Sequence, residues 1–227
     1  MLTFAQRARK TPGALVRPSD ACYTGDDATR HDIIMDHQGQ TAFLARDGRE
    51  VRVRQEQAGD AGHLVHLFQH LGPASRYYRF SKDATSADPA SVQQRAEELA
   101  RQGPPHDMAW LAFADLPKEP DAAVAAARYV RLDGEEDVGE LAISVRDDMQ
   151  RQGIGGQMLR FLLEQARADG MRRLVANFQA TNQGVWGLLR HSPYRVTTTL
   201  DGSMVRAEVD LTQPIGDSGP TAATLDG

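Results

Sequence analysis

A glycine-rich turn and a carboxylate ten residues before it are the two features of this sequence that suit chemistry. The turn, Gln150 to Gly156, has glycine at three of its last four positions. Because glycine has no Cβ, the backbone there can approach a ligand closely, and the free N–H groups of a following helix point to the same place. The turn is therefore predicted to hold an anion.

Glu140 is the carboxylate, and it stands in the otherwise apolar run Val138–Val145, which is predicted to be a strand. Alternation along a strand gives Glu140 the same face as Ala142 and Ser144 and the opposite face to Leu141. A lone carboxylate in such a strand is unusual. It suits either an acid–base role or a salt bridge at the strand end, and the residues alone leave both open.

Three strands and a helix are predicted to position these groups. Apolar runs at Met108–Ala114, Val124–Leu132 and Val138–Val145, separated by polar turns, indicate an antiparallel meander. The turn then opens a helix over Ile154–Asp169, and Leu174–Phe178 is predicted to be a strand parallel to the one before that helix, a βαβ unit. The buried stripe of the helix is expected to be Met158, Leu159, Leu162, Leu163 and Ala166, with Gly170 just past its end.

Further elements are predicted on either side of this unit. Short apolar runs at 33–35 and 42–44 suit an edge hairpin, Val51–Arg54 alternates as a strand, and a hairpin around Asp201-Gly202 closes the domain. Helices are indicated after Asp88-Pro89 and over 182–190.

Another helix is predicted to begin after Asp60, its expected N-cap, and to stop at Gly72-Pro73. Its buried face is expected to comprise Leu64, Val65, Phe68 and Leu71. The remaining face carries three histidines, His63, His66 and His70. No carboxylate or cysteine joins them in the sequence, so we expect a solvent-exposed face rather than a metal site, and no metal is predicted.

Three interpretations of the glycine turn compete. It could be a plain tight connection, a dinucleotide-binding fingerprint, or a cradle for the pyrophosphate of an acyl-CoA. The dinucleotide fingerprint requires a glycine three residues after Gly155, where Met158 stands, and an alternating parallel sheet that the meander contradicts. The other two interpretations stay open at this level.

The pattern Gln150-x-x-Gly153-x-Gly155, set between an antiparallel strand and a helix, resembles the acyl-CoA-binding motif of the GNAT N-acetyltransferase superfamily. The order of the predicted elements is similar to that fold over residues 50–211. The resemblance implies an α/β (α+β) fold, with a mixed, mostly antiparallel twisted sheet, helices on both faces and a central βαβ unit.

Within the superfamily, two stretches resemble bacterial protein-lysine acetyltransferases that act on acyl-CoA synthetases. They are Gly48–Phe80, with Arg52 and the run Ser75–Phe80, and Gly139–Ile143. The resemblance implies acetyl transfer from acetyl-CoA to a primary amine by direct attack in a ternary complex, with a protein lysine as acceptor. A small-molecule amine as acceptor, or a non-catalytic acyl-CoA-binding module, is the alternative.

The resemblance also implies roles for individual residues. Glu140 would be the general base, directly or through a water. The tyrosine acid that many members carry is replaced by Leu189, so the leaving thiolate would be protonated by solvent or by the amine's own proton. The acceptor side would be shaped by Tyr77, Tyr78 and Arg79, unless these pack in the core. The donor site would comprise Ile143, Ser144, Val145, Gln150, Arg151, Gln152, Gly153, Ile154, Gly155 and Gly156, with Asn182 as a further contact or only a helix cap.

Composition narrows the class of protein. A net charge of −5 over 227 residues argues against nucleic acid as the main partner, and no apolar run approaches the roughly 20 residues of a membrane span. We expect a cytoplasmic protein, a monomer or homodimer. The expected organisation is an N-terminal extension over 1–47, an acetyltransferase domain over 48–211 and a disordered tail over 212–227.

Overall fold

The computed structural model describes residues 34–35, 41–80 and 87–215, and the structural statements below concern these residues. Most of the expected N-terminal extension and most of the expected tail lie outside them. None of the helices in the described ranges has the length and apolar character that crossing a membrane requires.

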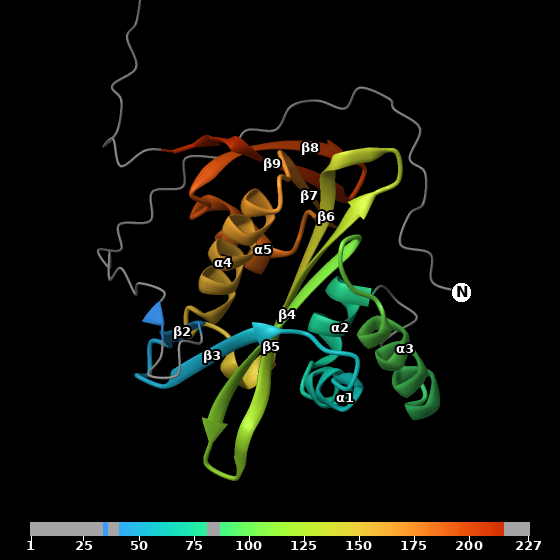
Figure 1. Ribbon diagram of the computed structural model, residues 1–227, viewed down its shortest axis with the longest axis vertical. Coiled ribbons are helices and arrows are strands. Elements are labelled where there is room, and N and C mark those ends of the chain that lie inside the picture. The colour runs from blue at the N-terminus through green and yellow to red at the C-terminus, as the bar shows by residue number, and fades with distance from the viewer. Residues whose placement is uncertain (1–33, 36–40, 81–86, 216–227) are drawn as a thin grey trace, which may run out of the picture.

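A single twisted sheet of nine described strands forms the centre of the molecule, in the order β1-β2-β3-β4-β5-β6-β7-β9-β8 (Figure 1). Neighbouring strands are antiparallel except for β6 and β7, which are parallel. The predicted meander and βαβ unit are therefore confirmed. The strands are β1 Ile34–Met35, β2 Thr41–Leu44, β3 Glu50–Gln55, β4 Asp107–Leu116, β5 Glu119–Leu132, β6 Glu135–Val145, β7 Arg173–Gln179, β8 Tyr194–Asp201 and β9 Met204–Pro214.

Five described helices cover the two faces of the sheet (Figure 1). Helices α1, α2 and α3 lie on one face, and α4 and α5 lie on the other. Helices α3, α4 and α5 begin within a residue of where the sequence predicts them, whereas α2 is not indicated by any apolar periodicity. The bounds are α1 Ala61–Gln69, α2 Pro73–Phe80, α3 Pro89–Arg101, α4 Ile154–Ala168 and α5 Gln183–Arg190.

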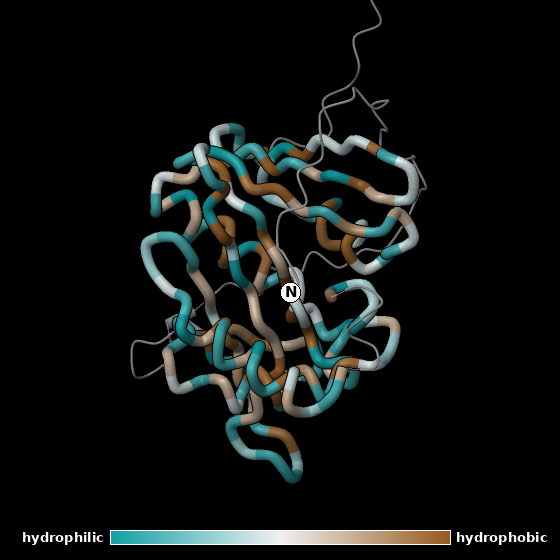
Figure 2. The backbone as a smooth tube through the Cα atoms, turned by 90° about the vertical axis from the view of Figure 1, so that its right-hand side faces the viewer, coloured by the Kyte–Doolittle hydropathy of each residue, from teal (hydrophilic) through white to brown (hydrophobic). Residues whose placement is uncertain are grey.

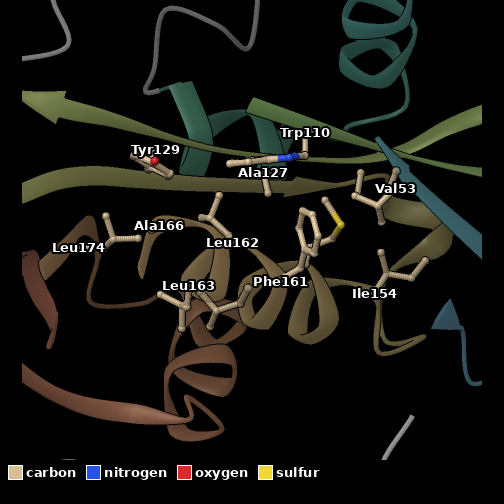
Figure 3. Packing of buried hydrophobic residues seen from close by; sticks show 14 of the residues in the cluster. Val53, Trp110, Ala127, Tyr129, Ile154, Phe161, Leu162, Leu163, Ala166 and Leu174 are labelled. Carbon is tan, nitrogen blue, oxygen red and sulfur yellow. The ribbon is translucent and has the colours of Figure 1, made fainter. Parts of the chain in front are cut away.

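The main core lies between α4 and the sheet (Figure 3). All five residues of the predicted stripe are buried, and Ile154 and Phe161 of α4 join them. Phe161 meets Trp110 of β4 edge to face, with ring centroids 5.6 Å apart. Since burying one large apolar side chain contributes about 1.5 to 3 kcal/mol, this packing fixes the position of α4 and of the glycine turn at its start.

The sheet extends beyond both expected limits of the domain. Strand β2 pairs with β3, and Ala42, Phe43 and Ala45 are fully buried. Strand β9 continues to Pro214. The hairpin between β4 and β5 projects from the rest of the domain (Figures 1 and 2), and its turn is only Pro117 and Lys118, shorter than expected.

Two expectations for α1 hold only in part. Leu71 is buried and Leu64 packs against a small buried cluster, as expected, but the fully buried residue within α1 is Leu67. Phe68 packs edge to face on Phe80 of α2, with ring centroids 5.5 Å apart. Phe68, which was expected to face the sheet, therefore packs on α2, a helix that no apolar periodicity predicts. Asp60 precedes α1 but makes no side-chain cap, because its carboxylate takes two bonds of 2.7 and 2.8 Å from Arg54. Two charge-assisted bonds to one guanidinium fix the orientation of the carboxylate.

The three histidines of α1 also differ from expectation. His63 packs edge-on against Phe113 with centroids 5.1 Å apart. His66 and His70 are about one-third exposed, and they face Glu119 at the start of β5. The prediction that no carboxylate joins the histidines is therefore wrong, because the β4–β5 hairpin brings Glu119, which is distant in the sequence, beside His66 and His70.

A buried arginine links α3 to the sheet. Arg128 of β5 donates to Glu56 at 2.7 Å and to the Leu99 carbonyl of α3 at 3.2 Å. It also faces Asp107 at 3.3 Å. Arg128 is shared by two buried carboxylates, so its charge offsets only part of the cost of burying them. Burial therefore raises the pKa of Glu56 to about 7 and also raises the pKa of Asp107.

Replacing Glu56 by Gln should change how stability depends on pH. The folded protein binds the Glu56 proton more tightly than the unfolded chain does. Protonated Glu56 therefore stabilises the fold below about pH 4.5, and this contribution is lost as pH rises to about 7. Relative to the wild type, the free energy of unfolding of the variant should rise by up to about 3 kcal/mol across this pH window. Urea unfolding of both proteins from pH 4.5 to 8 measures the difference, and parallel stability curves would contradict it.

Candidate functional site

Strands β6 and β7 diverge at Glu140. Their pairing covers only Val138, Gly139 and Glu140 on β6, opposite Arg173, Leu174 and Val175 on β7. Beyond that point β6 continues along β5 to Val145, and β7 continues along β9 to Gln179. In the described chain, the edge of β6 from 141 to 145 that faces β7 has no strand partner. Its backbone groups can therefore bond an extended ligand, at the place where Ile143, Ser144 and Val145 are predicted to do so.

Glu140 stands at the last residue pair before the divergence, and its side chain is half-exposed. Asn177 of β7 donates its side-chain N–H to Glu140 Oε1 at 3.1 Å. Leu141, Ile143 and Val145 pack against the core, so Glu140 faces the opposite side, toward α1 to α3. Since the hydrogen-bond partner in the described chain is a neutral amide, the alternative of a strand-end salt bridge is not observed.

Within the described residues, the start of α4 offers backbone N–H groups that precede the first helical hydrogen bond. Gly153 adopts φ +82°, a left-handed conformation, and makes no side-chain cap. The first helical bond runs from the Gln157 N–H to the Gly153 carbonyl, so the N–H groups of Ile154, Gly155 and Gly156 precede it. These donors and the positive end of the helix dipole suit a phosphate.

Two of the glycines in the turn differ in their surroundings. A Cβ on Gly155 would lie 3.3 Å from Leu188 and 3.6 Å from Val145, so Gly155 lets α4 pack closely on α5 and β6. Gly156 is exposed, and a Cβ there would meet no heavy atom within 4 Å. The space beside Gly156 is therefore open to a ligand.

Gln150 holds the turn in place. Its side-chain N–H groups donate to the Val145 carbonyl at 3.2 Å, to Asp147 Oδ1 at 3.0 Å and to Ser75 Oγ at 3.2 Å. The motif glutamine thus joins the end of β6 to α2. Arg151 and Gln152 follow it, Arg151 at φ +61° with an exposed side chain.

Arg46 is a neighbour of the turn that the sequence did not reveal. Its backbone N–H donates to the Gln152 carbonyl at 2.9 Å, and its side-chain Cγ lies 3.7 Å from the Cβ position of Gly153. The exposed guanidinium therefore lies beside the start of α4. No local pattern could have found Arg46, because it precedes the turn by more than 100 residues and lies in a stretch assigned to the extension.

The free edge of β6 therefore runs from Glu140, at the divergence from β7, to Val145, which lies beside Gly155 at the start of α4. The sequence profile of the acetyltransferase (GNAT) family matches residues 75–192, which is more than half of the chain. The chain belongs to this family. It is an acyltransferase, and GNAT enzymes generally take the acetyl group from acetyl-CoA.

Several known proteins are similar to this GNAT chain. Acetyltransferase PA5475 of Pseudomonas aeruginosa is 28% identical over 141 residues, 61% of this chain and 72% of that protein. An L-methionine sulfoximine/L-methionine sulfone acetyltransferase of the same species is 30% identical over 113 residues, 50% of this chain and 63% of that protein. The crystal structure of the GNAT domain of S. lividans PAT matches with a TM-score of 0.64 at 23% identity. That match covers 75% of this chain and 96% of that domain, and it confirms the GNAT fold.

In this GNAT domain the predicted acceptor residues lie on α2. Tyr77 is half-buried and Tyr78 is 36% exposed, with ring centroids 5.7 Å apart. Arg79 is half-buried, and its guanidinium is close enough to Glu140 for the two charges to attract. Burial is the main cause that lowers the pKa of Arg79 to about 10, with Arg128 adding to it, whereas Glu140 opposes the shift.

Asn182, Leu189 and Tyr194 are the remaining positions that the sequence analysis weighed for a role in acetyl transfer. Asn182 Oδ1 accepts from the Val185 N–H at 3.2 Å, so its helix-cap role is confirmed. Leu189 is buried in the core. Tyr194 is buried as well, and its hydroxyl donates to Glu164 at 2.9 Å. The Asn182 side-chain oxygen is therefore used in the cap of α5, and the Tyr194 hydroxyl is bonded to Glu164 of α4.

Proposed function

We propose that this enzyme acetylates a protein lysine, with Glu140 as the general base and with direct attack on acetyl-CoA. The observation that carries the proposal is the position of Glu140 at the last β6–β7 pair, between the free edge of β6 and helix α2. An extended thioester along that edge would bring its carbonyl near this carboxylate. No other carboxylate of β6 stands at the divergence.

The proposed reaction has three movements of atoms. Glu140 takes a proton from the acceptor ammonium, directly or through a water, and the free amine forms a bond to the thioester carbon. Backbone N–H groups of 143–145 would stabilise the developing oxyanion. The C–S bond then breaks, and the CoA thiolate takes a proton from solvent or from the attacking amine, since Leu189 supplies none.

The donor would be held chiefly by the start of α4. The N–H groups of Ile154, Gly155 and Gly156 suit its pyrophosphate, and the open space at Gly156 accommodates it. Gln150 supports this site by bonding the turn to the end of β6. The Arg46 guanidinium would add a positive charge beside the phosphates.

Replacing Arg46 by Ala should raise the KM for acetyl-CoA by about 5- to 10-fold with little change in kcat. An exposed cation a few ångströms from a phosphate contributes on the order of 1 kcal/mol, and salt weakens it. Initial rates at low and at 0.5 M salt measure the effect, which should shrink at high salt. Arg49→Ala is the control, because Arg49 pairs with Asp47 in the same turn. Equal effects of the two changes would exclude a phosphate contact by Arg46.

The choice of a protein lysine is supported by the run Ser75–Phe80. It forms α2, and Ser75 is bonded to Gln150 of the donor turn. The exposed Tyr78 ring suits the apolar stem of a lysine side chain. Acyl-CoA synthetases are the protein acceptors that the resemblance of this run to protein-lysine acetyltransferases favours.

An amino-acid-like amine is the second candidate acceptor. It is favoured by the relative named for L-methionine sulfoximine and L-methionine sulfone, and by the cationic Arg79 on the Glu140 side. A guanidinium there could bind the carboxylate of such an acceptor.

Parallel assays separate the candidates. Acetyl-CoA carrying a heavy-isotope acetyl group is incubated with host proteins, with an acyl-CoA synthetase and with free amines that include methionine sulfoximine, and products are identified by mass spectrometry. Labelled lysine in proteins is the expected result. Labelling of free amines alone, abolished by Arg79→Gln, would replace the lysine proposal with the second candidate. Donor binding by calorimetry without any labelled product would instead indicate a non-catalytic acyl-CoA-binding module.

A further inference from the structure

A cluster of three potential metal ligands lies on the face of the sheet that carries α1. His66 and His70 are one turn apart on α1, and Glu119 is the first residue of β5. Their ligand atoms all lie within 4.8 Å of one another. His66 Nε2 is 3.4 Å from Glu119 Oε2, and His70 Nε2 is 3.8 Å from Glu119 Oε1.

These separations are close to those around a tetrahedral ion. Ligand atoms at about 2.0 to 2.2 Å from Zn²⁺ are roughly 3.4 Å apart when the angle at the metal is tetrahedral. Small side-chain rotations would therefore bring the three atoms to bonding distance without moving the backbone. Two histidines at i and i+4 on a helix are a recurrent way of providing two such ligands.

The hydrogen bonds of His70 prepare its outer nitrogen for a metal. Nδ1 of His70 lies 2.9 Å from the His66 carbonyl oxygen. Because a carbonyl only accepts, Nδ1 carries the hydrogen, and in the neutral ring Nε2 then carries the lone pair that faces Glu119. A backbone carbonyl in this position is a common second partner of metal-binding histidines.

Arg146 limits which oxygen of Glu119 is available. It donates to Glu119 Oε2 at 2.7 Å and forms two bonds of 2.9 and 2.8 Å with Asp148. Glu119 Oε1 has no hydrogen bond from Arg146, and it is the oxygen that faces His70. Asp148 balances the arginine charge, so the carboxylate of Glu119 remains to offset part of the charge of a metal ion.

We propose that His66, His70 and Glu119 bind a divalent transition-metal ion, with Zn²⁺ best matched, at a site separate from Glu140. Two imidazoles and one carboxylate are a common zinc ligand set that leaves one position for water. A hollow of about 280 Å³, lined by His63, His66, Glu119 and Asp121 among others, adjoins the cluster and can hold that water.

The ion would join α1 to the β4–β5 hairpin. The backbone N–H of Asp147 donates to the His70 carbonyl at 3.1 Å, and the Asp147 side chain accepts from Gln150 at 3.0 Å. The metal site is thus linked by two hydrogen bonds to the turn before α4. Metal binding should stabilise this part of the fold by linkage.

Calorimetry on the full chain, free of any polyhistidine tag and treated with chelator, tests the proposal. We expect one Zn²⁺ per chain with micromolar affinity, and affinity at least 10-fold weaker at pH 5.5 than at pH 7.5. Co²⁺ in place of Zn²⁺ should give the visible absorption of a four-coordinate site. Zn²⁺ should also raise the melting temperature.

Matched variants locate the ion. Glu119→Gln, which keeps an acceptor for Arg146, and His66→Ala should each weaken Zn²⁺ binding at least 30-fold. His191→Ala should not, although His191 bonds the carbonyl four residues before it at 2.8 Å just as His70 does. Circular dichroism and acetyl-CoA binding verify folding. No binding at 100 µM Zn²⁺, or equal binding by the Glu119→Gln variant and the wild type, would overturn the proposal and leave acetyl transfer untouched.

Discussion

Replacing Glu140 by Gln should lower kcat about 100-fold and leave the affinity for acetyl-CoA within about twofold. The glutamine keeps the size of the side chain and can still accept from Asn177, but it cannot take a proton from the acceptor ammonium. General-base catalysis typically contributes on the order of 10²- to 10⁴-fold, and the smaller figure applies where water can partly substitute. The loss therefore belongs to the chemical step.

The pH profile distinguishes this role from a structural one. The rate of the variant should rise with pH, because the acceptor itself supplies more free amine as pH rises, and the gap to the wild type should narrow. Glu136→Gln, an exposed carboxylate at the start of the same strand, is the control and should behave as wild type. A Glu140→Gln variant with wild-type kcat at every pH would remove Glu140 as the base.

Replacing Gly156 by Asp should raise the KM and Kd for acetyl-CoA about 100-fold while the protein stays as stable as the wild type or becomes more stable. The exposed position has room for the side chain, and Asp in the first turn of a helix interacts favourably with the helix dipole. The same negative charge would lie beside the proposed pyrophosphate. Two unit charges about 4 Å apart repel by roughly 4 kcal/mol at an effective dielectric of about 20, and solvent reduces this.

Gly156→Asn is the matched control, because it has nearly the same shape without the charge. It should raise the KM by only a fewfold, and thermal unfolding should show that both variants fold. If Asp and Asn weakened donor binding equally, the effect would be one of bulk, and an anion at the start of α4 would not be supported. If neither changed it, the donor would bind elsewhere.

The elements with strong periodicity could be predicted from the sequence. The stripe of α4 is buried at every expected position, and the parallel β6–β7 pair follows from the apolar strand, glycine turn and helix between them. These features depend on residues close together in the chain, so their patterns are visible locally.

The features that could not be predicted depend on contacts between distant residues. Helix α2 has no fully buried residue, so it gives no apolar stripe to detect. Asp60 stands at the N-cap position of α1, but its carboxylate bonds Arg54 instead of the helix. Glu119 reaches α1 only because the ladder between β4 and β5 continues past the apolar run. Arg46 joins the glycine turn through one backbone bond to Gln152. In each case tertiary structure overrides the local pattern.

Within the candidate site, too, some features could be predicted from the sequence and others could not. The motif glycines and Glu140 are recognisable by type and spacing, and β6 connects them: Glu140 stands where β6 and β7 diverge, and Val145 lies beside Gly155 of α4. The neutral partner of Glu140 and the support that Gln150 gives to α2 required the fold.

The most direct test of the central proposal is a crystal structure of the full chain with a non-reactive acetyl-CoA analogue. In the proposed complex the pyrophosphate accepts from the N–H groups of Ile154, Gly155 and Gly156. The carbonyl of the analogue lies along β6 between 141 and 145, with Glu140 within reach directly or through one water. A donor bound away from the start of α4, or a carbonyl on the far side of the sheet from Glu140, would contradict the proposal.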